Sequence, residues 1–152
     1  MNKALSILFI FLFAGAVRAA DFDRTFVTPP GADPKVAAPY SSGVLVKGTY
    51  YVSGSLGIDP ATGKVPADAE AEAHLVLDSV KQTLERAGLT MADLVSVTIY
   101  CTDLELYDKF NAIYRSYFQG HYPSRAFIGV AKLVRGAHFE VAGIAVKPAK
   151  SR

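Results

Sequence analysis

Cysteine is nearly absent from this chain, which has one cysteine and no tryptophan in 152 residues. A single thiol cannot close an internal disulfide or complete a site with several thiolate ligands, so disulfide-stapled scaffolds and zinc ribbons are excluded. The one thiol, Cys101, ends the apolar run 94–101. We expect it to be buried in a strand as a small hydrophobe, with a reactive thiol as the alternative.

Several motifs that carry chemistry are also missing. Residues 57–64 have the spacing Gly-x5-Gly-Lys followed by Val65, whereas a phosphate-binding loop needs Gly-x4-Gly-Lys and then Ser or Thr. The three histidines form no HExxH motif and no close group with the cysteine, so no metal site is predicted. Ser53 lies outside any Gly-x-Ser-x-Gly elbow, and we expect it to form hydrogen bonds rather than to attack a substrate.

No apolar run is suited to crossing a membrane. Residues 4–16 form an apolar run of 13 residues after a basic start at Lys3, and small residues follow at positions 17–20. At about 1.5 Å per residue this run is too short to span a bilayer core. The pattern is typical of an export signal. We expect residues 1–19 to be a signal peptide cleaved after Ala19, which would make the protein periplasmic or secreted, with no membrane contact afterwards. An uncleaved anchor is the alternative.

An excess of one charge is missing as well. The chain has 16 basic and 14 acidic residues, and removal of residues 1–19 would remove Lys3 and Arg18 and leave 14 of each. A neutral mature chain offers no basic face for phosphates, so no nucleic-acid partner is expected. With 51% hydrophobic and 20% charged residues, the chain should instead form one ordered domain with a core.

Proline, glycine and apolar spacing divide this domain into elements. The segment 20–39 carries four prolines and should be an extended arm. Two segments have apolar residues at helical spacing, and five are rich in strand-forming residues. The predicted helices span 67–87 and 105–118, and the predicted strands span 44–47, 49–53, 94–101, 126–134 and 138–146.

The order ββαβαββ predicts an α+β fold. Two helices between strands favour one mixed or largely antiparallel sheet with both helices on a single face. Apolar residues at alternating strand positions, namely Tyr50, Val52, Ile99 and Phe127, suggest apolar side chains on both faces. A second apolar face is usually covered by another subunit, so we expect an oligomer.

Two charged residues, Arg125 and Glu140, are poorly placed for purely structural roles. Arg125 stands at the mouth of a predicted strand, and Glu140 lies inside the most apolar strand. A buried carboxylate needs a cation, a proton or a wet cleft, because leaving it unpaired costs several kcal/mol. The planar guanidinium of Arg125 suits a bidentate grip on a ligand carboxylate. The alternative is an ion pair between these two residues, within the chain or across a subunit boundary.

Ordered motifs over most of the chain resemble the RidA/YjgF family of enamine/imine deaminases. The most diagnostic is Pro-Ser-Arg-Ala at 123–126, with Glu140 fifteen residues after Arg125. The other matching segments are 38–43, 52–54, 59–68, 77–88 and 110–114. The resemblance implies that residues 40–148 form a chorismate-mutase-like, RidA-type domain. It also implies a homotrimer with three clefts at the subunit boundaries.

The same resemblance implies roles for individual residues. Arg125 would hold the substrate carboxylate and Glu140 would position or activate a water, so these two are the candidate catalytic residues. The residues that would line the cleft are Tyr40, Ser53, Asn111 and Phe127. Phe127 stands where many relatives have Cys, so substrate preference can differ.

The implied chemistry is hydrolysis of 2-aminoacrylate-type enamines, or their imine tautomers, to 2-keto acids and ammonia. No metal or organic cofactor is required, because the imine carbon is already electrophilic and needs only orientation, a water and proton transfer. The partners would be a small imine or 2-keto acid. The alternative is a non-catalytic trimeric module that binds small carboxylates in the periplasm. Ribonuclease or chaperone-like activity, also attached to this family, is disfavoured for RNA by the neutral charge.

Overall fold

A computed structural model describes residues 23–28 and 38–148. The predicted signal peptide, 1–19, and most of the predicted arm lie outside the described residues, so both remain predictions. Within the two described stretches, no helix has the length and hydropathy to cross a membrane.

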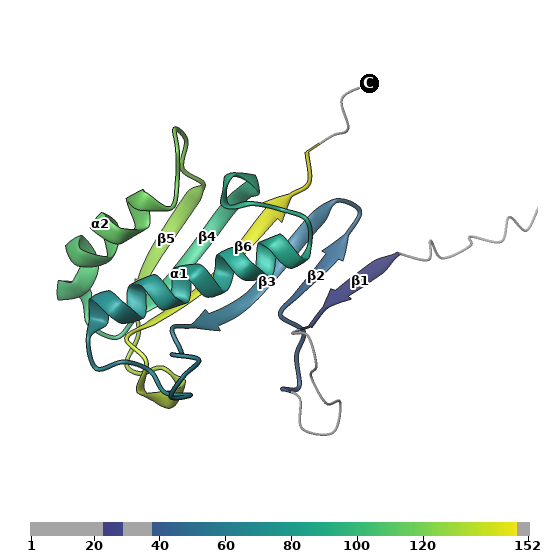
Figure 1. Ribbon diagram of the computed structural model, residues 1–152. Coiled ribbons are helices and arrows are strands. Elements are labelled where there is room, and N and C mark those ends of the chain that lie inside the picture. The colour runs from purple at the N-terminus through teal and green to yellow at the C-terminus, as the bar shows by residue number, and fades with distance from the viewer. Residues whose placement is uncertain (1–22, 29–37, 149–152) are drawn as a thin grey trace, which may run out of the picture.

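The described chain forms a six-stranded sheet with two helices on one face (Figure 1). The strands lie in the order β1-β2-β3-β6-β4-β5. Their bounds are Arg24–Val27 (β1), Gly43–Val46 (β2), Thr49–Leu56 (β3), Leu94–Cys101 (β4), Ser124–Gly129 (β5) and Phe139–Val146 (β6). Helix α1 spans Ala69–Arg86 and α2 spans Tyr107–Ser116. The predicted α+β class and the placement of both helices on one face are confirmed.

The sheet is mixed, as predicted. Neighbouring strands run antiparallel except for β4 and β5, which are parallel and are connected through α2. Strand β6 lies between β3 and β4, so the last strand in the chain occupies the centre of the sheet. Helix α1 crosses β3 and β6, and α2 packs beside α1 at the β5 side of the sheet, so neither helix covers β1 or β2 (Figure 1).

Two strand predictions need correction. The arm contains a strand, β1, which pairs with β2 and makes the order βββαβαββ. The strand predicted at 126–134 is shorter and begins earlier, because β5 ends at Gly129 and a 3-10 turn follows at Val134–Gly136. The pairing of β5 with β4 ends at Gly129, opposite Cys101, and Arg135 (φ 59°) and Gly136 (φ 69°) then form the turn before β6.

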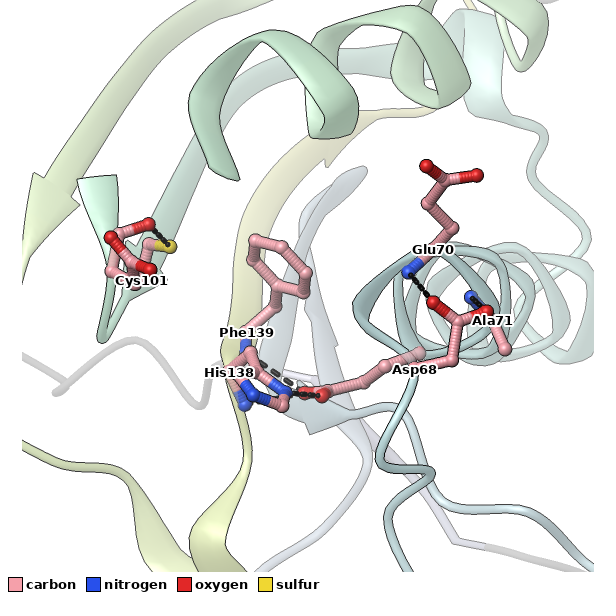
Figure 2. A network of polar contacts seen from close by, with 8 residues as sticks. Asp68, Glu70, Ala71, Cys101, His138 and Phe139 are labelled. Carbon is pink, nitrogen blue, oxygen red and sulfur yellow. Dashed lines mark hydrogen bonds and ion pairs between the residues drawn. The ribbon is translucent and has the colours of Figure 1, made fainter. Parts of the chain in front are cut away.

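Helix α1 begins two residues later and ends one residue earlier than the predicted span 67–87. Asp68 is the N-cap, and its carboxylate accepts the backbone N–H groups of Glu70 and Ala71 (Figure 2). Beyond the last turn, Gly88 has φ +72° and its N–H donates to the carbonyl of Glu85. This left-handed glycine ends the helix and lets the chain turn back toward the sheet.

The core lies between the sheet and the helices. Tyr50, Val52 and Ile99 all face the helices and are buried, and Phe127 on the same face is partly buried. The prediction that these four indicate two apolar faces is therefore wrong. The opposite face nevertheless carries apolar side chains, since Tyr51 is 51% exposed and Ile128 is 41% exposed. Nothing within the described residues packs on that face as a second layer.

Candidate active site

Arg125 rests on a platform of aromatic rings at the edge of the sheet. It lies on β5, opposite Val97 of β4. Its Cζ atom is 4.8 Å from the ring centroid of Tyr114 and 5.7 Å from that of Tyr107, both on α2. Its Nη2 donates a hydrogen bond of 3.4 Å to the hydroxyl of Tyr107. Cation–π contacts hold the guanidinium in place without neutralising its charge.

A cavity of about 280 Å³ adjoins this guanidinium. The residues that line it are Tyr107, Asn111, Tyr114, Arg115, Tyr122, Pro123 and Arg125. Two of the predicted site residues, Asn111 and Arg125, thus meet in one cavity, where Asn111 is 7% exposed. Among the described residues, no carboxylate oxygen lies within 4.0 Å of the Arg125 guanidinium. The cavity therefore offers a free cation beside a buried amide, which suits a small carboxylate.

Phe127 supports Arg125 from the same strand. Its ring packs edge-on against Tyr107 at 4.9 Å and Phe110 at 5.7 Å between centroids, and the Arg125 Cζ lies 5.8 Å from its centroid. Phe127 therefore connects Tyr107, which contacts the guanidinium, to Phe110 of the core. It is not among the residues that line the 280 Å³ cavity.

Glu140 lies on the other face of the sheet. Phe139, the residue before it, is 1% exposed and packs on Phe110 of α2, so the alternation along β6 points Glu140 away from the helices. Its carboxyl group lies against Gly54 of β3, where a Cβ atom would overlap Oε1. Glycine at 54 is therefore required for this side chain to occupy its place.

Arg125 and Glu140 of one chain do not face one another. Arg125 and Phe127 contact the rings of α2, whereas Glu140 lies on the uncovered face of the sheet. Within one chain, the alternative that these two residues form an ion pair is therefore wrong. Any ligand that touches both groups must do so across two copies of the chain.

Tyr40 and Ser53 lie outside the Arg125 cavity. Together with Gly54 they line a second cavity, of about 460 Å³, beside α1. The Ser53 hydroxyl donates a hydrogen bond of 2.7 Å to the carbonyl of Ser41, which fixes the segment that carries the exposed Tyr40. Ser53 thus forms hydrogen bonds, as predicted. The six predicted residues fall into two groups, one around Arg125 and one around Gly54.

One buried carboxylate, Glu72 of α1, was not predicted from the sequence. It is 0% exposed and lies on the buried face of the helix, four residues before Val76 and eight before Val80. Its Oε2 lies 2.6 Å from Nδ1 of His138, and its Oε1 accepts backbone N–H groups at the start of β6. The helical pattern could not reveal this role, because the partners lie 66 residues further along the chain.

Burial controls the protonation of two groups near the site. Burial raises the pKa of Tyr114 to about 12, although the charge of Arg125 opposes the shift. Burial also raises the pKa of the Cys101 thiol, and its Sγ donates to the carbonyl of Asp103 at 3.0 Å. Cys101 is 0% exposed, so the prediction of a buried small hydrophobe is confirmed. The residues that the structure describes contain no group of three or more His, Cys, Asp and Glu that could hold a metal ion.

Comparison with known proteins identifies the family. The family model described as "Endoribonuclease L-PSP" matches residues 30–147, which is most of the chain. The chain belongs to this family, the RidA/YjgF family. Its sequence is 38% identical over 115 residues to 2-iminobutanoate/2-iminopropanoate deaminase of Bos taurus, an alignment that covers 75% of this chain and 84% of the relative. The Escherichia coli deaminase of the same name is 37% identical over 117 residues, with 75% and 91% covered.

Solved structures of the family share the fold described above. The YjgF gene product of E. coli superposes with a TM-score of 0.74 at 34% identity and covers 82% of this chain and 99% of its own. E. coli TdcF with bound serine superposes with a TM-score of 0.73 at 31% identity, with 82% and 100% covered. A RidA-type α+β domain is thus confirmed, with β1 as part of the sheet.

Proposed function

We propose that this protein is an enamine/imine deaminase that hydrolyses 2-aminoacrylate-type imines of amino acids to 2-keto acids and ammonia. One observation carries the proposal. Arg125 presents its guanidinium to a cavity beside Asn111 with no carboxylate partner among the described residues, in a chain 38% identical to a named imine deaminase. An amino-acid-derived imine carries the carboxylate that such a cation binds.

The reaction needs a water, a proton acceptor and a proton donor. Water adds to the imine carbon, the carbon–nitrogen bond breaks, and ammonia leaves as the carbonyl of the 2-keto acid forms. Glu140 accepts a proton from the attacking water and passes it to the imine nitrogen, and it then transfers the hydroxyl proton of the addition intermediate to the departing amino group, which is general acid–base catalysis. Arg125 holds the carboxylate, so the imine carbon stays within reach of that water. The chemistry assigned to this site requires no cofactor.

A site shared between protomers is supported by the placement of Arg125 and Glu140 on opposite faces of one chain. We propose that the uncovered sheet face of one protomer packs beside β5 and α2 of the next. Contact between two different surfaces is heterologous and forms a ring when the rotation between neighbours closes, and the family resemblance favours a ring of three. The exposed apolar side chains of Tyr51 and Ile128 on the uncovered face support this assembly.

The compartment is part of the same proposal. A basic start, an apolar run and small residues at 17–20 support cleavage after Ala19 and a periplasmic or secreted protein. Mass spectrometry of the protein recovered from the periplasm tests this. A chain that begins at Ala20 is the expected result, and a chain that retains residues 1–19 would contradict it.

A coupled assay tests the activity. An amino-acid oxidase generates an imine in the presence of the mature protein, and semicarbazone formation reports the imine that remains. We expect accelerated loss of the imine with the wild-type protein. In Arg125→Ala the acceleration should fall by about a hundredfold or more, with the oligomer intact, because the carboxylate loses its charge-assisted grip. Binding of a 2-keto acid without acceleration would instead support the carboxylate-binding module.

A further inference from the structure

Glu72 anchors the beginning of the strand that carries Glu140. Its Oε1 accepts the backbone N–H groups of His138 at 2.7 Å and of Phe139 at 2.8 Å, and its Oε2 contacts His138 Nδ1 at 2.6 Å. Figure 2 shows His138 and Phe139 at the start of β6, with dashed lines from both to one carboxylate. Glu140 is the next residue along the strand.

Burial of the Glu72 carboxylate costs free energy unless hydrogen-bond donors surround it. Glu72 is 0% exposed, and a buried carboxylate without partners would destabilise the fold. Three donors surround it, two of them backbone N–H groups, which also need partners when buried. The carboxylate and the strand start therefore stabilise each other.

Two glycines, Gly54 in β3 and Gly57 just after it, leave room for the carboxylates of Glu140 and Glu72 on opposite sides of the sheet. A Cβ atom at Gly57 would overlap the backbone of Glu72, and one at Gly54 would overlap the carboxyl group of Glu140. Glu72 thus reaches the strand from the helix-covered face, while Glu140 leaves it on the uncovered face. A shift of the His138–Phe139 backbone would move Glu140 directly.

We propose that Glu72 is a positioning residue for the reaction: it fixes the backbone at His138 and Phe139 and thereby the place of the Glu140 carboxyl group. The inference rests on the proposed function, in which Glu140 handles the protons. Glu72 has no contact with the Arg125 cavity. Its loss should therefore impair the chemical step and leave carboxylate binding unchanged.

The test compares Glu72→Ala, Glu72→Gln and the control Glu70→Ala in the imine assay on the assembled protein. Glu70 is on the same helix but exposed, and its carboxylate lies 3.6 Å from Lys109. We expect Glu72→Ala to lower kcat about tenfold or more with KM within about twofold of wild type. Glu72→Gln should recover most of kcat, because its amide oxygen still accepts both backbone N–H groups. Glu70→Ala should match wild type.

The outcomes separate this inference from the proposed function. A wild-type protein without activity would remove the proposed function itself. An active wild type with a Glu72→Ala variant that assembles and keeps full kcat would overturn only the positioning role, as would a loss confined to KM. If Glu72→Ala does not assemble, Glu72→Asp decides, because its carboxylate is one methylene too short to reach both N–H groups. A lowered kcat in Glu72→Asp supports the inference, and full kcat overturns it.

Discussion

At the scale of single residues, the Arg125 site depends on aromatic rings rather than on counter-charges. The guanidinium lies over Tyr114 and beside Tyr107, which hold it while leaving its charge available. A carboxylate in the same position would neutralise it and compete with substrate. The site therefore keeps one unpaired cation at a cavity, at the cost of a buried hydroxyl without a partner in the described part of the chain, that of Tyr114.

Tyr114→Phe should make the protein more stable. The Tyr114 hydroxyl is buried and has no hydrogen-bond partner among the described residues. An unsatisfied buried hydroxyl costs free energy, so its removal should raise the free energy of unfolding by ~1 kcal/mol. Urea denaturation at neutral pH measures this. A fall in stability of similar size would mean that the hydroxyl has a partner in the assembled protein.

The difference in stability between Tyr114→Phe and the wild type should increase at alkaline pH. Burial raises the pKa of Tyr114 from 10.0 to about 12, so between these values the unfolded chain has released the proton that the folded chain still holds. A folded state that binds more protons loses stability as pH rises. The advantage of Tyr114→Phe over wild type should therefore grow between pH 10 and about 12. Denaturation curves at pH 9 and pH 11 compare the two, and a constant difference would contradict the assignment.

At the scale of elements, helix α1 positions both Glu72 and one wall of the cavity that Tyr40 and Ser53 line. Its first turn is fixed by Asp68, which accepts the N–H groups of Glu70 and Ala71. Glu72 follows within the same turn, so the cap also determines where the buried carboxylate lies.

Asp68→Ala should destabilise the fold by about 1 kcal/mol, because two N–H groups of the first turn lose their acceptor. Asp68→Ser is the matched control, since a serine oxygen can still cap the helix, and it should recover most of the loss. Thermal denaturation of the three proteins gives the comparison. Equal melting temperatures for Asp68→Ala and wild type would show that the cap contributes nothing.

The helices could be predicted from the sequence more completely than the sheet. Apolar spacing and Gly88 define α1 locally, and the observed span differs from the prediction by two residues at its start and one at its end. Strand β1 was missed because a short exposed strand among prolines has no pattern of its own and exists through its pairing with β2. The early end of β5 at Gly129 depends likewise on pairing, here with Cys101 of β4.

The sequence indicated which residues form the candidate site more completely than how those residues are arranged in space. Arg125 and Asn111 were expected together and do share a cavity. The separation of Arg125 from Glu140 follows from strand register and side-chain alternation, which the sequence does not specify. Glu72 was missed because its role depends on partners brought together only by the fold.

At the scale of the whole molecule, the two faces of the sheet have different tasks. One face holds the helices and the Arg125 cavity, and the other presents Glu140 among half-exposed apolar side chains such as Ile128. A single chain therefore contains both halves of the proposed site, the Arg125 cavity and Glu140, but holds them on opposite faces of the sheet. In the proposed assembly the neighbouring protomer completes the site, so we expect catalysis to depend on the oligomer.

Complementation between two inactive variants tests this claim most directly. Arg125→Ala and Glu140→Gln are each expected to be inactive, and they are unfolded, mixed in equal amounts and reassembled. In mixed rings some clefts combine an intact Arg125 with an intact Glu140 of the neighbour, so about a quarter of wild-type activity should return. Refolded wild type and each variant refolded alone serve as controls. Mixed rings without activity, beside a fully active refolded wild type, would contradict a site shared between protomers.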